Sequence, residues 1–179
     1  MRLFIAINLS PETKDKLIAL TGELRAASPR GNFSLPENLH LTLAFLGECS
    51  ENQASRAKSA MDALDFQPFD LRVERIGRFP REGGDIWWAG VSQSGPLMAL
   101  HRDLTEHLLR ADFSLERRPY RPHITLGRKV SASLPPRPVT PFAQRVTSIE
   151  LMKSEQIAGK LTYTAIYAKT LPPPPTSFV

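Results

Sequence analysis

The sequence predicts an α+β fold built from two related lobes. Short segments rich in β-forming residues alternate with only three helical segments, and tight turns between consecutive strands favour antiparallel pairing. One phrase also occurs twice, as HLTLAFLG from residue 40 and as HITLGRKV from residue 123. The copies lie 83 residues apart (123 − 40), one in each half, whereas a solenoid needs at least three short repeats. We therefore expect residues 1–179 to form a single bilobal domain.

The first half of the chain carries two clear helix starts. Ser10 precedes Pro11, and this pair is typical of a helix start, because a serine hydroxyl caps free amide groups and proline fits the first helical position. Ser50 and Gln53 have the spacing of a capping box. The elements predicted here are a strand at 2–9, a helix at 11–27, a loop at 28–38, a strand at 39–47 and a helix at 51–64.

The second half begins with a hairpin pattern and ends with another. Leucines recur three or four residues apart between residues 96 and 111, which predicts an amphipathic helix. Prolines predict a loop at 131–141, and the proline-rich tail 172–179 is expected to be extended and loosely held. The remaining predicted elements are strands at 69–79 and 86–92 around a turn at 80–85, the second repeat strand at 123–130, and a final hairpin of 145–155 with 161–171.

Composition narrows the class of protein. Hydrophobic residues make up 41% of the chain and charged residues 23%, which is ordinary for a globular protein. No apolar run approaches the length of a membrane span, and the first ten residues are too short for a signal peptide. Cys49 is the only cysteine, so no internal disulfide can form, and we expect a cytoplasmic location without membrane contact. The net charge of +5 weakly favours a polyanionic partner such as nucleic acid.

The repeated phrase has chemical meaning when each copy is placed on a strand. Successive side chains on a strand point to opposite faces. The polar faces are His40, Thr42 and Ala44 in the first copy and His123, Thr125 and Gly127 in the second. The opposite faces are apolar, so Phe45 is expected in the core. If the lobes face each other, two imidazoles and two hydroxyls meet in one cleft.

Two imidazoles suit the cleavage of a phosphodiester without a metal. The neutral imidazole takes a proton from the nucleophile, and the charged imidazole gives a proton to the leaving oxygen. Threonine hydroxyls can donate hydrogen bonds to phosphate oxygens as charge develops. A single His-x-Thr is usually no more than a polar strand face, but two copies make that interpretation weak. A metal site is disfavoured, because no carboxylate or cysteine lies at ligand spacing from either histidine.

These residues resemble the paired His-x-Thr-x motifs of the two-histidine (2H) phosphoesterase superfamily. The segments RLFIAINL, NLHLTLAFLGE, IWWAGV and RPHITLGR together resemble its LigT-like branch, the bacterial and archaeal RNA 2′,3′-cyclic phosphodiesterases. The resemblance extends from Arg2 to about Tyr167, with the motifs at 40–43 and 123–126. It implies two mainly antiparallel sheets related by a pseudo-twofold axis, helices on the outside and the active site in a cleft between the lobes.

The resemblance also implies an activity and residue roles. The expected reaction is hydrolysis of an RNA 2′,3′-cyclic phosphate end to a 2′-phosphomonoester, with no cofactor. His40 would be the proton donor and His123 the proton acceptor, while Thr42 and Thr125 would hold the phosphate. Arg128 matches a basic residue that the family often has there. Its position on a regular strand is on the face opposite His123, so it needs a bulge or the strand end to reach the cleft.

Other conspicuous residues have ordinary explanations. His101 and His107 lie six residues apart in the third helix, which is not a metal-pair spacing, so we expect them on its surface or flank. Trp87 and Trp88 point to opposite faces of their strand; one belongs to the core, and packing is also the expected role of the other. The arginines of ERRPYR are placed for contact with an RNA backbone beside the second motif, and Cys49 has no evident catalytic role.

Three functions remain open from the sequence. The first is the metal-independent cyclic phosphodiesterase, and the second is a 2′–5′ RNA ligase that joins tRNA halves with the same residues. The third is an RNA-binding module in which the histidines only recognise a phosphate. The expected partner is RNA with a cyclic phosphate end, such as a tRNA fragment, or a cyclic nucleotide, and the protein is expected to be a monomer.

Overall fold

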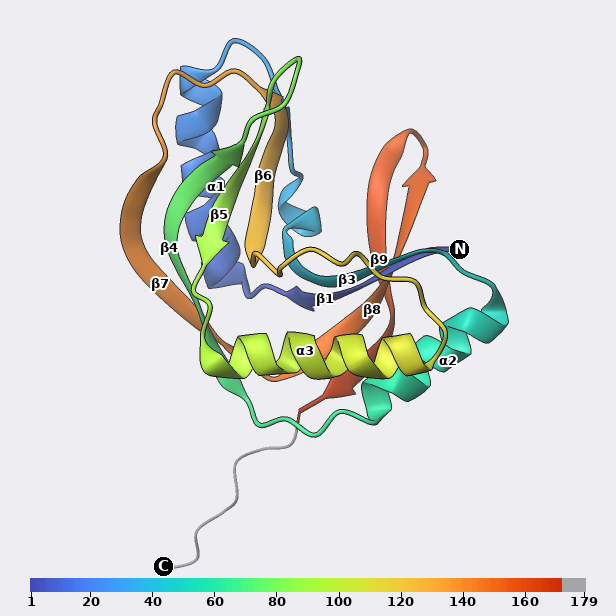
Figure 1. Cartoon of the computed structure of the whole chain (residues 1–179). Coiled ribbons are helices and arrows are strands. Elements are labelled where there is room, and N and C mark those ends of the chain that lie inside the picture. The colour runs from blue at the N-terminus through green and yellow to red at the C-terminus, as the bar shows by residue number, and fades with distance from the viewer. Residues whose placement is uncertain (172–179) are drawn as a thin grey trace, which may run out of the picture.

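Two antiparallel sheets organise the structure, a computed structural model that describes residues 1–171 (Figure 1). The four-stranded sheet has the order β3-β1-β8-β9, and the five-stranded sheet has the order β2-β6-β5-β4-β7. The strands are β1 (Arg2–Asn8), β2 (Asn32–Phe33), β3 (His40–Glu48), β4 (Phe69–Phe79), β5 (Asp85–Val91), β6 (His123–Val130), β7 (Arg137–Val146), β8 (Ser148–Ile157) and β9 (Lys160–Thr170). This arrangement confirms the predicted fold class.

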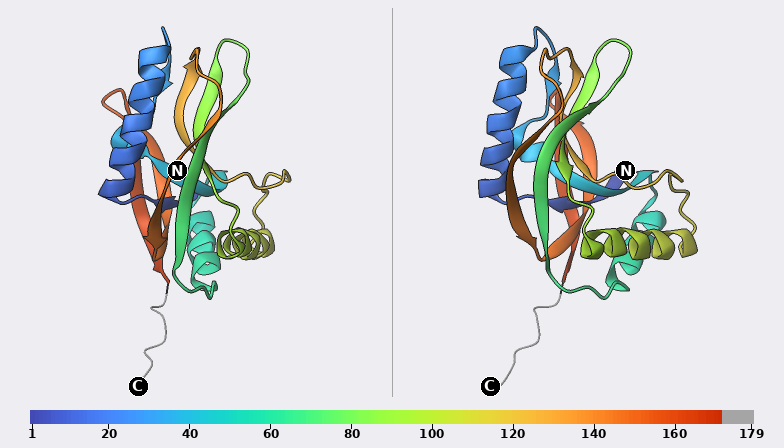
Figure 2. Two further views of the ribbon diagram at one scale, coloured as in Figure 1. Left: turned by 90° about the vertical axis from the view of Figure 1, so that its left-hand side faces the viewer. Right: turned by 60° about the vertical axis from the view of Figure 1, so that its left-hand side comes forward.

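Three helices cover the sheets, and their starts follow the predicted capping. They are α1 (Pro11–Ala27), α2 (Glu51–Asp62) and α3 (Gly95–Arg110), and a 3-10 turn, η1, spans Pro36–Asn38. The Ser10 hydroxyl accepts from the Thr13 amide at the start of α1, and the Ser50–Gln53 capping box is present. The helix α1 packs against β6 and β7 of the five-stranded sheet, while α2 and α3 pack together at the other end of the molecule (Figures 1 and 2). None of these helices is long and apolar enough to cross a bilayer.

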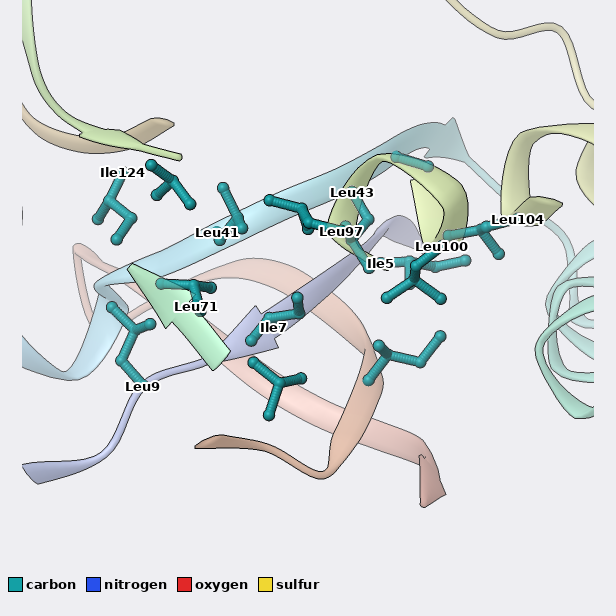
Figure 3. Close-up of a cluster of buried hydrophobic side chains, with 14 of the residues drawn as sticks. Ile5, Ile7, Leu9, Leu41, Leu43, Leu71, Leu97, Leu100, Leu104 and Ile124 are labelled. Carbon is teal, nitrogen blue, oxygen red and sulfur yellow. The ribbon is translucent and has the colours of Figure 1, made fainter. Parts of the chain in front are cut away.

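One hydrophobic core joins the two sheets and α3 (Figure 3). Ile5 and Leu41 of the four-stranded sheet, Ile124 of the five-stranded sheet and Leu100 of α3 all have no exposed surface. Each fully buried aliphatic side chain of this size contributes about 1.5–3 kcal/mol by leaving water. The lobes are therefore held together by a shared core, which fixes how the two motif strands face each other.

Two predicted loops contain strands. The loop at 28–38 includes β2, which pairs Phe33 with Gly127 of β6; a Cβ on Gly127 would lie 2.9 Å from the Phe33 ring, so the glycine makes room for that ring. The prediction of a loop at 131–141 is wrong from Arg137 onward, where the strand β7 begins. Because β7 is an edge strand that bonds only to β4, its prolines remove no hydrogen bond from an inner ladder. The predicted hairpin at 145–171 is confirmed as β8 and β9, although Arg145 and Val146 belong to β7. The tail 172–179 lies outside the described residues.

Candidate active site

The two repeated motifs lie on strands that contact each other across the two lobes. The strand β3 begins at His40 and forms one edge of the four-stranded sheet, while β6 begins at His123 and lies inside the five-stranded sheet. The two strands are in contact. The positive charge of His123 is close enough to lower the pKa of His40, and Arg128 lowers the pKa of both imidazoles. The structure therefore brings His40, His123 and Arg128 together.

Each histidine is oriented by the backbone carbonyl two residues before it. His40 Nδ1 lies 2.7 Å from the Asn38 oxygen, and His123 Nδ1 lies 2.6 Å from the Arg121 oxygen. A carbonyl oxygen can only accept, so Nδ1 carries the proton and donates it in both rings. This fixes the tautomer, leaving Nε2 of each neutral imidazole as a proton acceptor and Nε2–H of each charged imidazole as a donor.

An aromatic ring supports each imidazole in the same geometry. The Tyr163 ring of β9 meets the His40 ring edge to face, with centroids 5.2 Å apart and an interplanar angle of 87°. The Phe79 ring of β4 meets the His123 ring at 5.2 Å and 88°. Edge-to-face contacts of this kind are favourable for aromatic groups, and they restrict the rotation of each imidazole. The pseudo-twofold relationship thus extends from the motifs to the side chains that hold them.

The motif threonines lie beside the histidines on the predicted faces. The Thr42 hydroxyl is 2.9 Å from His40 Nε2, so it donates to the neutral imidazole and accepts from the charged one. Thr125 is half-buried on the face of β6 that carries His123, and it pairs with Trp88 of β5. Thr42 therefore lies within hydrogen-bond distance of His40, and Thr125 shares its strand face with His123.

A bulge follows each His-x-Thr and changes the face on which later residues lie. Opposite β1, Thr42 pairs with Ala6 and Ala44 pairs with Ile5, so Leu43 is the additional residue. Opposite β5, Thr125 pairs with Trp88 and Gly127 pairs with Trp87, so Leu126 is additional in the same way. A bulge shifts every following side chain to the opposite face. The two motif strands are therefore alike in their irregularity as well as in their sequence.

The bulges decide the positions of Phe45 and Arg128. The prediction that Phe45 belongs to the core is wrong, because its side chain is 65% exposed and lines the cleft. Arg128 could reach the cleft only through a bulge or at a strand end, and the bulge at Leu126 supplies that route. Its side chain is exposed, and its charge lowers the pKa of both imidazoles, although it is not among the residues that line the cleft.

The cleft beside the motifs has a volume of about 580 Å³. This is within the range of about 300–1,000 Å³ that small-molecule sites usually have. Its lining includes Thr42 and His123 but not His40, so the hollow extends from the motifs toward α3 and the segment that precedes β6. The aromatic lining residues are Phe45, Phe79 and Tyr120, and the basic ones are Arg81, Arg118 and Arg121. Aromatic and basic walls suit a nucleoside phosphate.

Several of these residues were not identified from the sequence, or were given another role. Tyr163, Phe79 and Tyr120 carry no local signal, because their partners are distant in the sequence. His101 is not simply at a helix surface: its ring stacks on Tyr120 with centroids 3.8 Å apart and an interplanar angle of 5°. Trp87 is fully buried and Trp88 is 7% exposed, so both pack as expected.

The environment lowers the pKa of both imidazoles. Burial is the main cause that lowers the pKa of His40; the Asn38 carbonyl opposes it, and the charges of His123, Arg128 and Lys14 lower the pKa further. Burial also lowers the pKa of His123, again against its carbonyl partner and together with Arg128. Both groups therefore favour the neutral form when the cleft is empty, and a bound phosphate would favour the charged form.

No metal site accompanies this arrangement within residues 1–171, because no three histidine, cysteine, aspartate or glutamate side chains are grouped to hold an ion. The arrangement can perform proton transfer through two imidazoles beside an anion held by hydroxyls and an arginine. A reaction without metal or cofactor remains a prediction that chelation can test.

The chain matches the family model of the 2′-5′ RNA ligase superfamily over residues 14–156. Proteins named RNA 2′,3′-cyclic phosphodiesterase are similar to it: the one from Archaeoglobus fulgidus is 34% identical over 129 residues, 72% of each chain. The one from Escherichia coli is 32% identical over 169 residues, 92% of this chain and 93% of that protein.

Solved structures of similar proteins have the same fold as this chain. The crystal structure of E. coli LigT complexed with 3′-AMP superimposes with a TM-score of 0.83 at 30% identity, covering 95% of this chain and 97% of that one. The TT0787 structure from Thermus thermophilus gives a TM-score of 0.83 at 28% identity, covering 96% and 98%. The resemblance stated from the motifs is confirmed: this chain, with its paired His-x-Thr-x strands, belongs to the 2′-5′ RNA ligase superfamily.

Proposed function

We propose that this protein is a phosphodiesterase that hydrolyses RNA 2′,3′-cyclic phosphate ends to 2′-phosphomonoesters. The observation that carries the proposal is the pair of imidazoles, each donating through Nδ1 to a backbone carbonyl, so that Nε2 of each ring is the atom that exchanges a proton. Relatives named RNA 2′,3′-cyclic phosphodiesterase support the substrate.

The proposed reaction needs one neutral and one charged imidazole. His123 Nε2 takes a proton from water as the water oxygen forms a bond to phosphorus. The bond from phosphorus to the ribose 3′-oxygen breaks, and His40 Nε2–H gives its proton to that oxygen. The product keeps its phosphate on the 2′-oxygen. His123 then loses a proton to solvent and His40 gains one, which returns both imidazoles to their starting states.

The remaining motif residues act on the phosphate. Thr42 and Thr125 donate hydrogen bonds to its non-bridging oxygens. The positive charge of Arg128 stabilises the negative charge that develops on these oxygens. When a substrate oxygen takes the place of Thr42 at His40 Nε2, the Thr42 hydroxyl becomes free to donate to the phosphate. The nucleoside occupies the 580 Å³ cleft, where exposed Phe45 offers a surface for stacking of a base.

A second candidate is supported by the family description itself. A 2′–5′ RNA ligase would use the same residues, with the 5′-hydroxyl of a second RNA attacking phosphorus in place of water and the ribose 3′-oxygen leaving. A binding module that recognises the phosphate without turnover is the third candidate. A tRNA fragment as the natural substrate, a monomeric state and a cytoplasmic location remain predictions.

One experiment separates these functions. The pure protein is incubated with nucleoside 2′,3′-cyclic monophosphates and with an RNA that ends in a cyclic phosphate, and the product isomers are identified by chromatography. We expect 2′-monophosphates from both, and loss of product with His40→Ala and with His123→Ala. Joined RNA in the presence of a 5′-hydroxyl RNA supports the ligase. Tight binding without product supports the binding module and refutes the proposed hydrolysis.

A further inference from the structure

A second, smaller hollow meets the active-site cleft at His123. Its volume is about 190 Å³, below the range of about 300–1,000 Å³ that whole small-molecule ligands usually require. It shares Phe79, Arg121 and His123 with the larger cleft and extends over β4 and β5. Arg75, Trp88 and Gly90 form its far wall. The hollow is suited to one chemical group of a ligand whose reacting part lies at His123.

Two glycines and a bulge shape this hollow. A Cβ on Gly77 would lie 2.4 Å from the Trp88 ring, and a Cβ on Gly90 would lie 2.8 Å from Arg75 Cγ. The glycines thus allow the tryptophan and the arginine to lie against the sheet. An additional residue at Glu74 brings Arg75 opposite Gly90, and its guanidinium lies 4.9 Å from the Trp88 ring centroid. This cation–π contact holds the guanidinium in place at the hollow.

No carboxylate among the described residues balances the positive charge of the hollow. Its lining includes Arg75 and Arg121 and no carboxylate. Other arginines of the same sheet do have acidic partners, such as Arg78 with Asp85 at 3.1 Å and Arg145 with Asp70 at 3.3 Å. Within residues 1–171, Arg75 and Arg121 form no ion pair. Arginine side chains beside a small hollow are suited to bind the oxygens of a phosphate group.

We propose that this hollow binds the phosphate on the 5′ side of the terminal nucleotide, so that the enzyme distinguishes an RNA end from a free cyclic mononucleotide. This inference rests on the proposed function, because the cyclic phosphate at His123 defines where the rest of the RNA begins. The next anion along the strand is that 5′ phosphate. Because the hollow meets the active-site cleft at His123, a phosphate bound by Arg75 and Arg121 would be adjacent to the cyclic phosphate on the same RNA end.

Three substrates that differ in one group test the proposal. They are adenosine 2′,3′-cyclic phosphate, the same compound with a 5′-phosphate, and the dinucleotide ApA with a 2′,3′-cyclic phosphate. A hydrogen bond to a charged group is worth about 1.5–3 kcal/mol, which corresponds to about 10-fold or more in kcat/KM. We expect the two substrates with a 5′ phosphate to exceed the first by that factor, mostly through KM.

The variant Arg75→Gln should remove most of that advantage while changing kcat/KM for adenosine 2′,3′-cyclic phosphate by less than about twofold. Arg145→Gln removes the same charge from the edge strand and should leave all three values unchanged. Arg75→Lys keeps the charge without the planar guanidinium and should retain part of the preference. The salt dependence of kcat/KM for the dinucleotide should become less steep in Arg75→Gln, because one phosphate contact is lost.

The outcomes separate this inference from the proposed function. Equal rates on all three substrates in the parent protein refute the 5′-phosphate subsite and leave the hydrolysis intact, without depending on any variant. Equal losses on all three in a folded Arg75→Gln assign Arg75 to structure and also refute it. Absence of turnover on every substrate refutes the proposed function. In that case calorimetry tests the subsite by comparing the affinities of adenosine 2′-phosphate and adenosine 2′,5′-bisphosphate. Equal affinities refute the subsite. Tighter binding of the bisphosphate that is lost in Arg75→Gln supports it.

Discussion

The hydroxyl of Tyr120 donates a 2.7 Å hydrogen bond to the backbone carbonyl of Thr42. These residues are 78 positions apart. Thr42 belongs to the first motif, whereas Tyr120 lies three residues before the histidine of the second motif. Burial raises the pKa of the phenol far above its usual value, so the hydroxyl keeps its proton and remains a donor. The bond connects the backbone of the first motif to the segment that delivers the second histidine.

The variant Tyr120→Phe should therefore lower activity while keeping the fold. Phenylalanine preserves the stack on His101 but leaves the Thr42 carbonyl without its donor, at a cost of about 1–3 kcal/mol in unfolding free energy. We expect kcat to fall more than KM rises, because the distance between the catalytic groups changes and the nucleoside contacts do not. Tyr167→Phe, which removes a hydroxyl contact with Asp62 on the exposed side of β9, is the control and should retain full activity. Equal kinetics for both variants would show that the Tyr120 bond does not position the motifs.

Removal of either motif hydroxyl should impair catalysis more than stability. Thr42→Val and Thr125→Val keep the shape of a half-buried side chain but remove the donor assigned to a phosphate oxygen. Loss of one such donor typically lowers kcat by about 10²–10³. Steady-state kinetics with a cyclic nucleotide and thermal unfolding of each variant check this. Turnover at the parent rate would assign the threonines to structure.

The two histidines should respond differently to the leaving group. A ribose 3′-oxygen needs a proton to leave, whereas a nitrophenolate leaves well without one. His40→Ala should therefore lose much less activity on an aryl phosphodiester than on a cyclic phosphate, provided the parent accepts both. His123→Ala should lose heavily on both, since water needs its base in either reaction. If His123→Ala is the variant spared on the aryl substrate, the acid and base are reversed.

The lowered pKa values predict a displaced pH profile. The bell-shaped profile of kcat/KM reports the free protein, so both of its limbs should lie below pH of about 6.5, the usual imidazole value. The profile of kcat reports the complex with substrate. Its limbs should lie at higher pH, because the phosphate charge favours the imidazolium form. Initial rates measured from about pH 4.5 to 8.5 give the kcat profile at saturating substrate and the kcat/KM profile at low substrate. Coincident profiles would contradict the assignment of the two limbs to imidazoles that contact the phosphate.

The same pKa values link stability to pH. Well above pH of about 6.5, the usual imidazole pKa, both imidazoles are neutral in the folded and unfolded states. As the pH falls below this value, the unfolded chain binds protons first, because its histidine pKa is higher than the folded one. The free energy of unfolding should therefore decrease until the pH reaches the folded values. Thermal unfolding between pH 7.5 and 5 should show this loss, and His40→Gln with His123→Gln should reduce it.

Activity should survive exhaustive chelation. Two imidazoles suffice for both proton transfers, and within the described chain no cluster of metal-ligand side chains exists. Rates are compared before and after dialysis against EDTA, with the metal content measured. Loss of turnover that a divalent ion restores would show that the reaction requires a metal.

Local sequence signals predicted much of this structure. The α1 and α2 starts were predictable because serine caps, proline and the capping box act within one helical turn. The shared strand face of each motif histidine and its threonine was predictable because alternation on a strand is a local rule. The bulges at Leu43 and Leu126 were not, and they explain why Phe45 was assigned to the wrong side.

Long-range contacts account for the rest. Tyr163, Phe79 and Tyr120 act through partners elsewhere in the fold, and no spacing in the sequence indicates those pairs. The strand β7 was missed for a related reason. Its prolines are compatible with a strand only at a sheet edge, and edge position is a property of the folded topology.

The matched bulges make the two lobes complementary rather than interchangeable. The residue five positions after each motif histidine follows the bulge and is exposed, but in one lobe it is the aromatic Phe45 and in the other the cationic Arg128. A fully symmetric cleft could accept a cyclic phosphate in two opposite orientations and would open either ester bond. An apolar ring after one histidine and a cationic group after the other are chemically different neighbours for a nucleotide. We expect this difference to favour one direction of entry, and therefore one phosphate isomer, which identification of the product isomer checks.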